Sequence, residues 1–252
     1  MNSELPALLS YVDITVRYST GTVAIDGLTL SVATGEFLSV VGPSGCGKST
    51  LLRLAGGLLA PTRGRVRRST ERVGFVFQDA TLLPWRTVRR NVELVGELSG
   101  LGRAERRARA IDALGRVGLG AVAEHHPATL SVGMRMRVSL ARTLTTRPDL
   151  FLFDEPFAAV DEINRARLGD DLQALFAADR FAALFVTHSV AEAVYLSTRV
   201  LVMSDSPGRI VGAVEVPFAY PRSPALRYTA EFTALTAQVQ HVLMRNTFAE
   251  AS

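Results

Sequence analysis

One short stretch of the sequence has the residue types and the spacing needed to hold a phosphate group. Gly42 is followed, after four residues, by Gly47, Lys48 and Ser49, which is the pattern of a phosphate-binding loop. Glycines let the backbone curl so that several amide N–H groups point inward, and the N-terminus of a following helix also attracts an anion. The stretch lies between a strand-like apolar run and a helix-like segment, as such a loop requires. We predict that a nucleotide is bound by Gly42, Pro43, Ser44, Gly45, Cys46, Gly47, Lys48, Ser49 and Thr50.

Position 48 carries the only lysine of the chain, whose other 27 basic residues are arginine. An ammonium group is a compact point charge suited to the β- and γ-phosphates of a nucleotide, and the planar guanidinium fork is a poor substitute. The hydroxyl of Ser49 can coordinate Mg²⁺ beside it. A glycine-rich turn without a function is the alternative, but the context and the composition together favour a phosphate-binding loop.

An acidic pair, Asp154 and Glu155, follows the apolar run 150–153. Ligands of an open α/β sheet bind at the carboxyl ends of its strands, so this pair should lie beside the phosphate loop. We expect Asp154 to hold Mg²⁺ through water, and Glu155 to orient and polarise a water that attacks the γ-phosphate. On its own, an acidic pair after a strand is more typical of a turn or a helix N-cap, but the phosphate loop reverses that preference.

Strands and helices that would position these groups alternate along the chain. Residues 11–18 alternate like a strand, and 27–41 are typical of two strands around a turn at Thr34–Gly35. A helix is predicted over about 48–59, and another strand over 72–78. This alternation indicates a parallel α/β sheet. Further strand-like runs lie at 149–155, 182–188, 199–204 and 209–216.

The segment 79–147 shows helical periods and no convincing strand. We therefore predict one domain, residues 1–252, whose α/β core (1–78 and 148–218) is interrupted by a helical subdomain. A C-terminal amphipathic helix is predicted over about 223–245. We interpret this helix as packing on the core, with a regulatory role or a dimer contact as the alternatives.

Composition limits the other classes of function. Hydrophobic residues make up 48% of the chain, yet the longest apolar runs are strand-length, far below the roughly 20 residues that span a bilayer. The N-terminus has neither the basic start nor the apolar segment of a signal peptide, and one cysteine fits a reducing cytoplasm. The formal charge is +4, and the arginines are dispersed among few aromatics, which favours a solvated surface over nucleic-acid binding.

Five further features, in chain order around the phosphate loop and the acidic pair, resemble the ATP-binding-cassette (ABC) ATPases. Gln78 ends a strand like the Q-loop of that family, and Leu-Ser-Val-Gly-Met at 130–134 is similar to its signature motif. Residues 158–161 resemble its D-loop, and His188 follows a strand like its switch histidine. Tyr18 lies where the family stacks an aromatic ring on adenine.

This resemblance covers about residues 10–215 and implies a fold, two cofactors and a mechanism. The implied fold is α/β: a P-loop NTPase core, with a RecA-like mixed sheet and an N-terminal antiparallel β part, plus an inserted α-helical subdomain. The implied cofactors are ATP and Mg²⁺, with two ATP molecules held between two copies of the chain. Implied roles are catalysis for Glu155, His188 and Gln78, metal binding for Ser49, Gln78 and Asp154, and contact with the other copy's ATP for Ser131, Val132, Gly133 and Met134.

Simpler interpretations stand beside these roles. Tyr18 could be an ordinary strand aromatic, Gln78 a surface amide, and His188 a structural histidine. Trp85, the only tryptophan, could be a core residue, although we prefer an anchor for a partner protein. We take His125–His126 as solvated residues and not as a metal pair.

The signature motif departs from the family pattern. The family usually has Leu-Ser-Gly-Gly where this chain has Leu-Ser-Val-Gly, and Met136 replaces an expected glutamine. If position 132 has ordinary helical angles, valine is sterically allowed there, and its side chain would crowd a γ-phosphate without removing the anion site. The expected consequence is an active but slowed ATPase.

Two segments resemble one branch of the family. Residues 79–94 and 216–224 are similar to the importer ATPases for nitrate, sulfonate, taurine and related small anions. We therefore expect the chain to be the ATP-hydrolysing subunit of an ABC importer, peripheral on the cytoplasmic face of the cell membrane. The alternatives are a slowed or regulatory cassette, or a soluble ABC ATPase acting on nucleic acid.

The importer interpretation implies partners. They are two membrane-spanning permease subunits, a second ATPase copy that is expected to be identical, and, indirectly, a periplasmic or extracellular solute-binding protein. No nucleic acid is expected.

Overall fold

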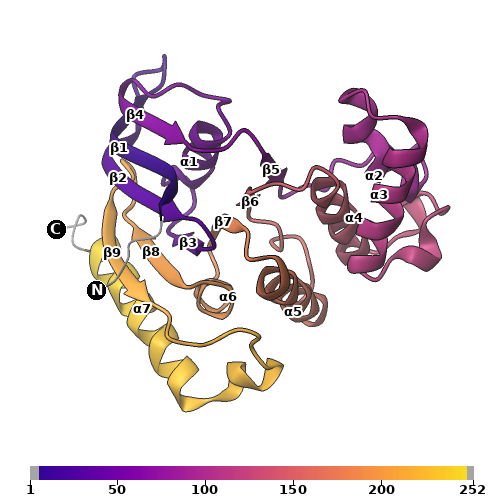
Figure 1. Cartoon of the computed structure of the whole chain (residues 1–252). Coiled ribbons are helices and arrows are strands. Elements are labelled where there is room, and N and C mark those ends of the chain that lie inside the picture. The colour runs from indigo at the N-terminus through magenta and orange to yellow at the C-terminus, as the bar shows by residue number, and fades with distance from the viewer. Residues whose placement is uncertain (1–5, 249–252) are drawn as a thin grey trace.

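The larger sheet of the computed structural model has six strands in the order β5-β6-β7-β3-β8-β9 (Figure 1). Its first five strands are parallel and β9 is antiparallel to β8, which confirms the expected mixed α/β sheet. The structure describes residues 6–248, so the ends of the predicted domain, 1–5 and 249–252, lie outside it. The strands are β3 (Phe37–Val41), β5 (Val73–Val76), β6 (Leu150–Asp154), β7 (Ala182–Thr187), β8 (Arg199–Met203) and β9 (Ile210–Glu215).

A smaller antiparallel sheet, in the order β2-β1-β4, confirms the expected N-terminal β part. It consists of β1 (Ala7–Arg17), β2 (Val23–Ala33) and β4 (Arg63–Arg68). The sequence pattern does not predict β4. This strand reads Arg-Gly-Arg-Val-Arg-Arg and lies mostly exposed at the sheet edge, so it lacks the apolar alternation that marks a half-buried strand.

The larger sheet separates two layers because alternate side chains of each strand face opposite sides. In β3, Leu38 and Val40 pack with α1 and the smaller sheet, whereas Phe37 and Val41 pack with α5, α6 and α7. None of the helices described is long and apolar enough to cross a membrane. The helices around the sheet are α1 (Lys48–Ala55), α5 (Glu162–Asp179), α6 (Val190–Leu196) and α7 (Ala230–Phe248).

Three helices form a lobe beside the larger sheet (Figure 1). They are α2 (Val88–Leu98), α3 (Arg103–Arg116) and α4 (Val132–Leu144), and the structure has no strand between residues 79 and 147. Val92, Leu114 and Val138, one from each helix, are fully buried in the same core cluster that covers one face of the sheet. The lobe is therefore packed onto the core through α4 and the segments that flank it.

Two elements end earlier in the structure than the sequence predicts. Helix α1 ends at Ala55, short of the predicted residue 59, because Gly57 turns into the left-handed region with φ of 71°. The N–H of Leu58 then donates to the carbonyl of Arg53 at 2.8 Å, which closes the helix end. Strand β5 covers Val73–Val76 and stops two residues before Gln78.

The C-terminal segment is held by a buried cation that the sequence analysis did not single out. A 3₁₀ turn, Pro224–Tyr228, precedes α7, so the predicted helix over 223–245 is two elements. Just before them, Arg222 is only 3% exposed. Its guanidinium donates at 2.7–3.2 Å to the carbonyls of Val194, Tyr195, Ser197 and Phe218.

We expect Arg222→Met to lower the free energy of unfolding by about 3 kcal/mol, because buried carbonyls left without a donor cost about 1–3 kcal/mol each. Urea denaturation of the full chain measures the change. Arg245→Met, which alters an exposed arginine of α7, is the control and should change stability little. Equal stability of the two variants would contradict a clamping role for Arg222.

Candidate active site

The phosphate-binding stretch has the expected strand–loop–helix setting. Strand β3 ends at Val41 and α1 begins at Lys48. Gly47 has φ of 104°, and a Cβ there would lie 2.7 Å from the carbonyl oxygen of Ala24. Only glycine satisfies both constraints. The backbone of the loop is therefore fixed by the packing beneath it.

The remaining residues of the loop differ in exposure. Ser44 and Gly45 are exposed at its tip, Pro43 is half-buried, and Cys46 is fully buried. Burial raises the pKa of the Cys46 thiol, so the thiol is not a reactive group here. The loop thus presents backbone groups to solvent and keeps its sulfur in the core.

Lys48 lies at the centre of the site and is 4% exposed. Its Nζ donates to the carbonyl oxygens of Gly42 at 2.8 Å and Pro43 at 2.7 Å. The same nitrogen is 3.6 Å from Oε1 of Glu155. The ammonium group thus joins the phosphate-binding stretch to Glu155 of the acidic pair, which is 107 positions further along the chain than Lys48.

The hydroxyl of Ser49 donates to Oδ1 of Asp154 at 2.9 Å. Burial raises the pKa of the Asp154 carboxyl, the hydrogen bond from Ser49 opposes that shift, and the charge of Glu155 adds to it. A carboxylate and a hydroxyl at this separation are hard oxygen donors, which suit Mg²⁺. The donor set therefore fits the metal expected from the sequence.

Glu155 and His188 form a hydrogen-bonded pair, with Oε2 of the acid 2.8 Å from Nδ1 of the ring. Strand β7 lies between β6 and β3, so the residue after β7 arrives between the acidic pair and the phosphate loop. Glu155 has φ of 43°, a left-handed conformation that is uncommon for a residue other than glycine. Such backbone strain clusters at functional sites. We call Glu155 and His188 the acid–histidine pair.

Tyr18 also lies at the phosphate loop. Its hydroxyl is hydrogen-bonded to Oγ1 of Thr50 at 2.8 Å, and its side chain is half-buried. This contact ties the residue after β1 to the first turn of α1. The predicted stacking of Tyr18 on adenine stays a prediction.

Gln78 lies apart from the other predicted metal ligands. It is exposed and lines, with Val132 and Met136, a hollow of about 430 Å³ at the start of α4. Within residues 6–248, no hydrogen bond joins Gln78 to Ser49 or Asp154. Its metal-binding and catalytic roles therefore stay predictions.

The signature residues form the start of α4. The Ser131 side chain accepts a hydrogen bond from the N–H of Met134 at 3.2 Å and caps the helix. Val132 is the first helical residue, has a negative φ and is 40% exposed, so valine is sterically allowed there. Gly133 is buried. Among the described residues, no hydrogen bond or ion pair joins this motif to the loop 42–50 of the same chain.

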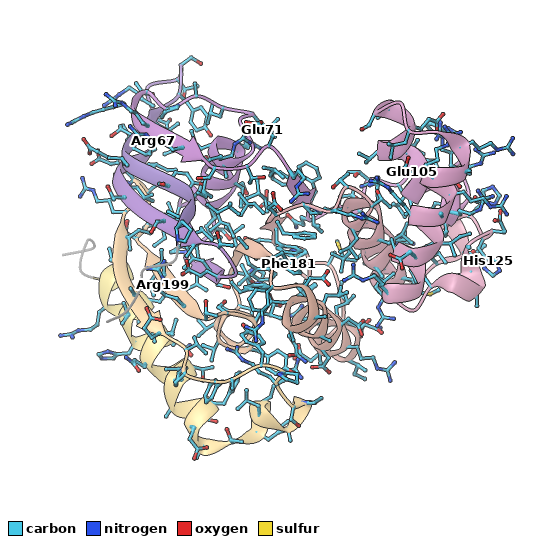
Figure 2. All side chains as sticks on the ribbon, viewed as in Figure 1. Arg67, Glu71, Glu105, His125, Phe181 and Arg199 are labelled. Atoms are coloured by element: carbon cyan, nitrogen blue, oxygen red, sulfur yellow. The ribbon has the colours of Figure 1, made fainter. Side chains whose placement is uncertain are left out.

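Other residues of the helical lobe face solvent. The side chain of Trp85 is 72% exposed, so the alternative that it is a core residue is wrong. His125 and His126 are exposed as well, and Figure 2 shows His125 on the outer side of the lobe. An exposed tryptophan is a costly surface residue that suits a partner contact.

Sequence reasoning missed Glu192, which lies close to the acid–histidine pair. Its carboxylate accepts a hydrogen bond from Oγ1 of Thr187 at 2.7 Å, directly before His188. The signal for it was the spacing Ser189-x-x-Glu192, which is typical of a capping box, and the Ser189 side chain does cap α6.

A mixed sheet whose central strand runs into a Gly-Lys-Ser loop, with an acidic pair at the carboxyl end of a nearby parallel strand, defines the class of P-loop NTPases. The structure brings Lys48, Ser49, Asp154, Glu155 and His188 into one site at this edge.

Within that class, the chain belongs to the ABC transporter family, whose sequence profile matches residues 25–158. It is 43% identical over 223 residues to an aliphatic sulfonates import ATP-binding protein of Mesorhizobium japonicum, covering 86% of this chain and 82% of that protein. A bicarbonate transport ATP-binding protein of Synechococcus elongatus is 43% identical over 209 residues, 79% of this chain but 32% of that longer protein. A dimeric ATP-binding cassette solved in a post-hydrolysis state, with ADP and phosphate bound, is 29% identical; the match covers 84% of this chain and 100% of that one, with a TM-score of 0.73.

Proposed function

We propose that the chain is the ATP-hydrolysing subunit of an importer for a small anion such as nitrate, a sulfonate or taurine. The observation that carries the ATPase part is the contact of one buried ammonium, Lys48 Nζ, with both the phosphate loop and the acid–histidine pair. The anion part is supported by the likeness to the aliphatic sulfonates and bicarbonate transport proteins.

In this proposal the loop 42–50 binds the phosphates of ATP. The exposed tip at Ser44 and Gly45 offers backbone N–H groups, and the N-terminus of α1 adds its partial positive charge. The Lys48 ammonium group gives up its hydrogen bonds to the two loop carbonyls and donates to phosphate oxygens instead. Phosphate oxygens are the better acceptors because they are charged. Tyr18, held at the loop by Thr50, supplies an aromatic face for the base.

Ser49 and Asp154 would hold Mg²⁺, and Gln78 would join them if its segment moves toward them. The bound metal would neutralise charge on the β- and γ-phosphates. The Ser49 hydroxyl and the Asp154 carboxylate are already adjacent, joined by a hydrogen bond of 2.9 Å, so one cation could contact both oxygens.

In this proposal Glu155 activates the attacking water. In the hydrolytic step, the water oxygen forms a bond to the γ-phosphorus, the bond from that phosphorus to the β,γ-bridging oxygen breaks, and Glu155 accepts the proton of the water. His188 holds the Glu155 carboxylate through Oε2, and so the other oxygen is left to face the phosphates. In an alternative arrangement, the imidazole turns its ring N–H from Glu155 to the γ-phosphate and stabilises charge there.

A second copy of the chain would complete the site. In the part of the chain that the structure describes, no hydrogen bond or ion pair joins Ser131–Met134 to the loop 42–50, and the similar solved cassette is dimeric. We propose that Ser131 and the first N–H groups of α4 bind the γ-phosphate held by the other copy, as a helix N-terminus can. Val132, being 40% exposed, would then lie next to that phosphate and slow turnover by crowding.

The chain would sit on the cytoplasmic face of the cell membrane, bound to two permease subunits. We propose that the docking surface is the segment from Gln78 to Val95, with the exposed Trp85 as its anchor. A solute-binding protein on the other side of the membrane would deliver the anion to the permease.

The importer proposal is tested by Trp85→Ala in the complex with the membrane subunits, reconstituted in liposomes with a radiolabelled aliphatic sulfonate. We expect uptake to fall at least about tenfold while ATP affinity stays unchanged, because hot-spot aromatics contribute 2 kcal/mol or more to an interface. The control is Tyr228→Ala, an aromatic that is 88% exposed outside the lobe. Uptake that is unaffected by Trp85→Ala, or a loss of ATP binding, would contradict this docking surface.

A further inference from the structure

The two members of the acid–histidine pair lie on separate loops. Glu155 begins the loop 155–161 between β6 and α5, and His188 lies in the short loop between β7 and α6. Backbone pairing of β6 with β7 sets where these loops start, and the N–H of Glu155 donates to the carbonyl of Val186 at 3.0 Å. Beyond that point, other contacts must keep the two loops at a fixed separation.

Glu192 holds the histidine loop. Its side chain is 13% exposed, and its Oε2 accepts a hydrogen bond from the Thr187 hydroxyl at 2.7 Å. That hydroxyl in turn accepts a hydrogen bond from the N–H of Ser189 at 3.0 Å. Glu192 therefore fixes the residues on both sides of His188, and no hydrogen bond joins its carboxylate to the imidazole ring within residues 6–248.

Arg165 holds the other loop. Its Nη2 donates to the carbonyl of Val160, at the end of the loop that begins with Glu155, at 3.0 Å. Its Nη1 lies 3.5 Å from Oε2 of Glu162, which is itself mostly exposed. The Nε atom is buried and has no hydrogen-bond partner within residues 6–248, and Oε1 of Glu192 lies 3.6 Å from it.

A cavity lies along one side of these residues. Arg165 and Glu192 line a space of about 580 Å³ together with Tyr228 and Phe232 of the C-terminal segment. Packing alone therefore does not hold the two charged side chains in place. A substitution that removes their attraction leaves room for the loops to move apart.

We propose that Arg165 and Glu192 form a bridge of positioning residues that fixes the separation of Glu155 and His188 in the catalytically competent geometry. The proposal rests on the proposed ATPase function. Neither side chain touches the reacting atoms, so the bridge acts on the chemical step and not on ATP affinity. A misplacement of about 1 Å in a catalytic group can cost up to a hundredfold in rate.

The test compares Glu192→Gln, Arg165→Met and the double variant in the full-length chain. Glu192→Gln keeps the volume and an oxygen that can accept from Thr187, and it removes the negative charge opposite Arg165. We expect each single variant to lower kcat for phosphate release from MgATP about tenfold with an unchanged Kd for ATP. The double variant should be no slower than the slower single one, because both remove the same bridge.

Arg167→Met is the matched control, since Arg167 is exposed two positions further along α5, and it should leave kcat unchanged. Wild-type kcat in both single variants, rate losses that multiply in the double variant, or a weaker ATP affinity at unchanged kcat would each overturn the bridge. Thermal unfolding identifies a single variant that does not fold. If one of the two fails to fold, the kcat of the other single variant tests the bridge. A wild-type chain that releases no phosphate would instead overturn the proposed function, and the bridge with it.

Discussion

Lys48→Ala is expected to weaken binding of MgATP to the full-length chain by at least about 100-fold. The Lys48 side chain is 4% exposed, and its ammonium group lies within hydrogen-bonding distance of two loop carbonyls, so the cation is desolvated and oriented before any nucleotide binds. Losing one partner of such a buried charge contact costs about 2–5 kcal/mol, and each 1.4 kcal/mol is a factor of ten in Kd. Phosphate release should become undetectable at the same time.

Lys48→Arg separates the shape of the cation from its charge. Arginine keeps the positive charge, but its planar fork does not fit between carbonyls 2.7 and 2.8 Å from one nitrogen. We therefore expect this variant to bind ATP little better than Lys48→Ala. Titration calorimetry measures both, with Arg67→Ala, an exposed residue on the outer edge strand β4, as the control (Figure 2). Full ATP affinity in Lys48→Ala would refute the nucleotide site.

The part of the site that could be predicted from the sequence is the part encoded by local spacing. The phosphate loop is nine consecutive residues, and the acidic pair directly follows an apolar run of strand length. Strand order then brings Asp154 and Glu155 to the loop, since the carboxyl ends of parallel strands share one edge. His188 follows the same logic, because it directly follows β7, the strand that lies between β6 and β3.

The features that could not be predicted depend on contacts between distant segments. Arg222 has the pattern of a surface arginine, but the fold brings it to the carbonyls of Val194, Tyr195 and Ser197, which are 25 to 28 positions earlier in the chain. Arg165 and Glu192 meet only because α5 and α6 pack together. Strand β4 carries four arginines and one apolar residue, so its pairing with β1 is set by the partner strand and not by its own pattern.

Glu155→Gln is expected to lower kcat for ATP hydrolysis about 1,000-fold, because a positioned general base contributes typically 10²–10⁴-fold to rate. The amide keeps the size of the side chain and a hydrogen bond to His188, but it cannot accept the proton of the attacking water. ATP affinity should be kept or slightly increased, since the substitution removes a negative charge 3.6 Å from Lys48 Nζ, where phosphates would bind. Phosphate release and ATP titration on the same preparation measure the two effects separately.

The persistence of ATP in this variant also reports on the second copy of the chain. If Ser131 of one copy binds the γ-phosphate held by the other, a nucleotide that is not hydrolysed should keep two copies together. Size-exclusion chromatography of Glu155→Gln should then show a dimer with MgATP and a monomer with MgADP. Glu105→Gln, which alters an exposed acid of α3, should hydrolyse ATP and show no such difference (Figure 2).

A Glu155→Gln chain that turns over ATP at the wild-type rate would show that Glu155 is not the general base. A Glu155→Gln chain that binds ATP but stays monomeric would contradict the role of the signature motif as the second set of hydrogen-bond donors to the γ-phosphate.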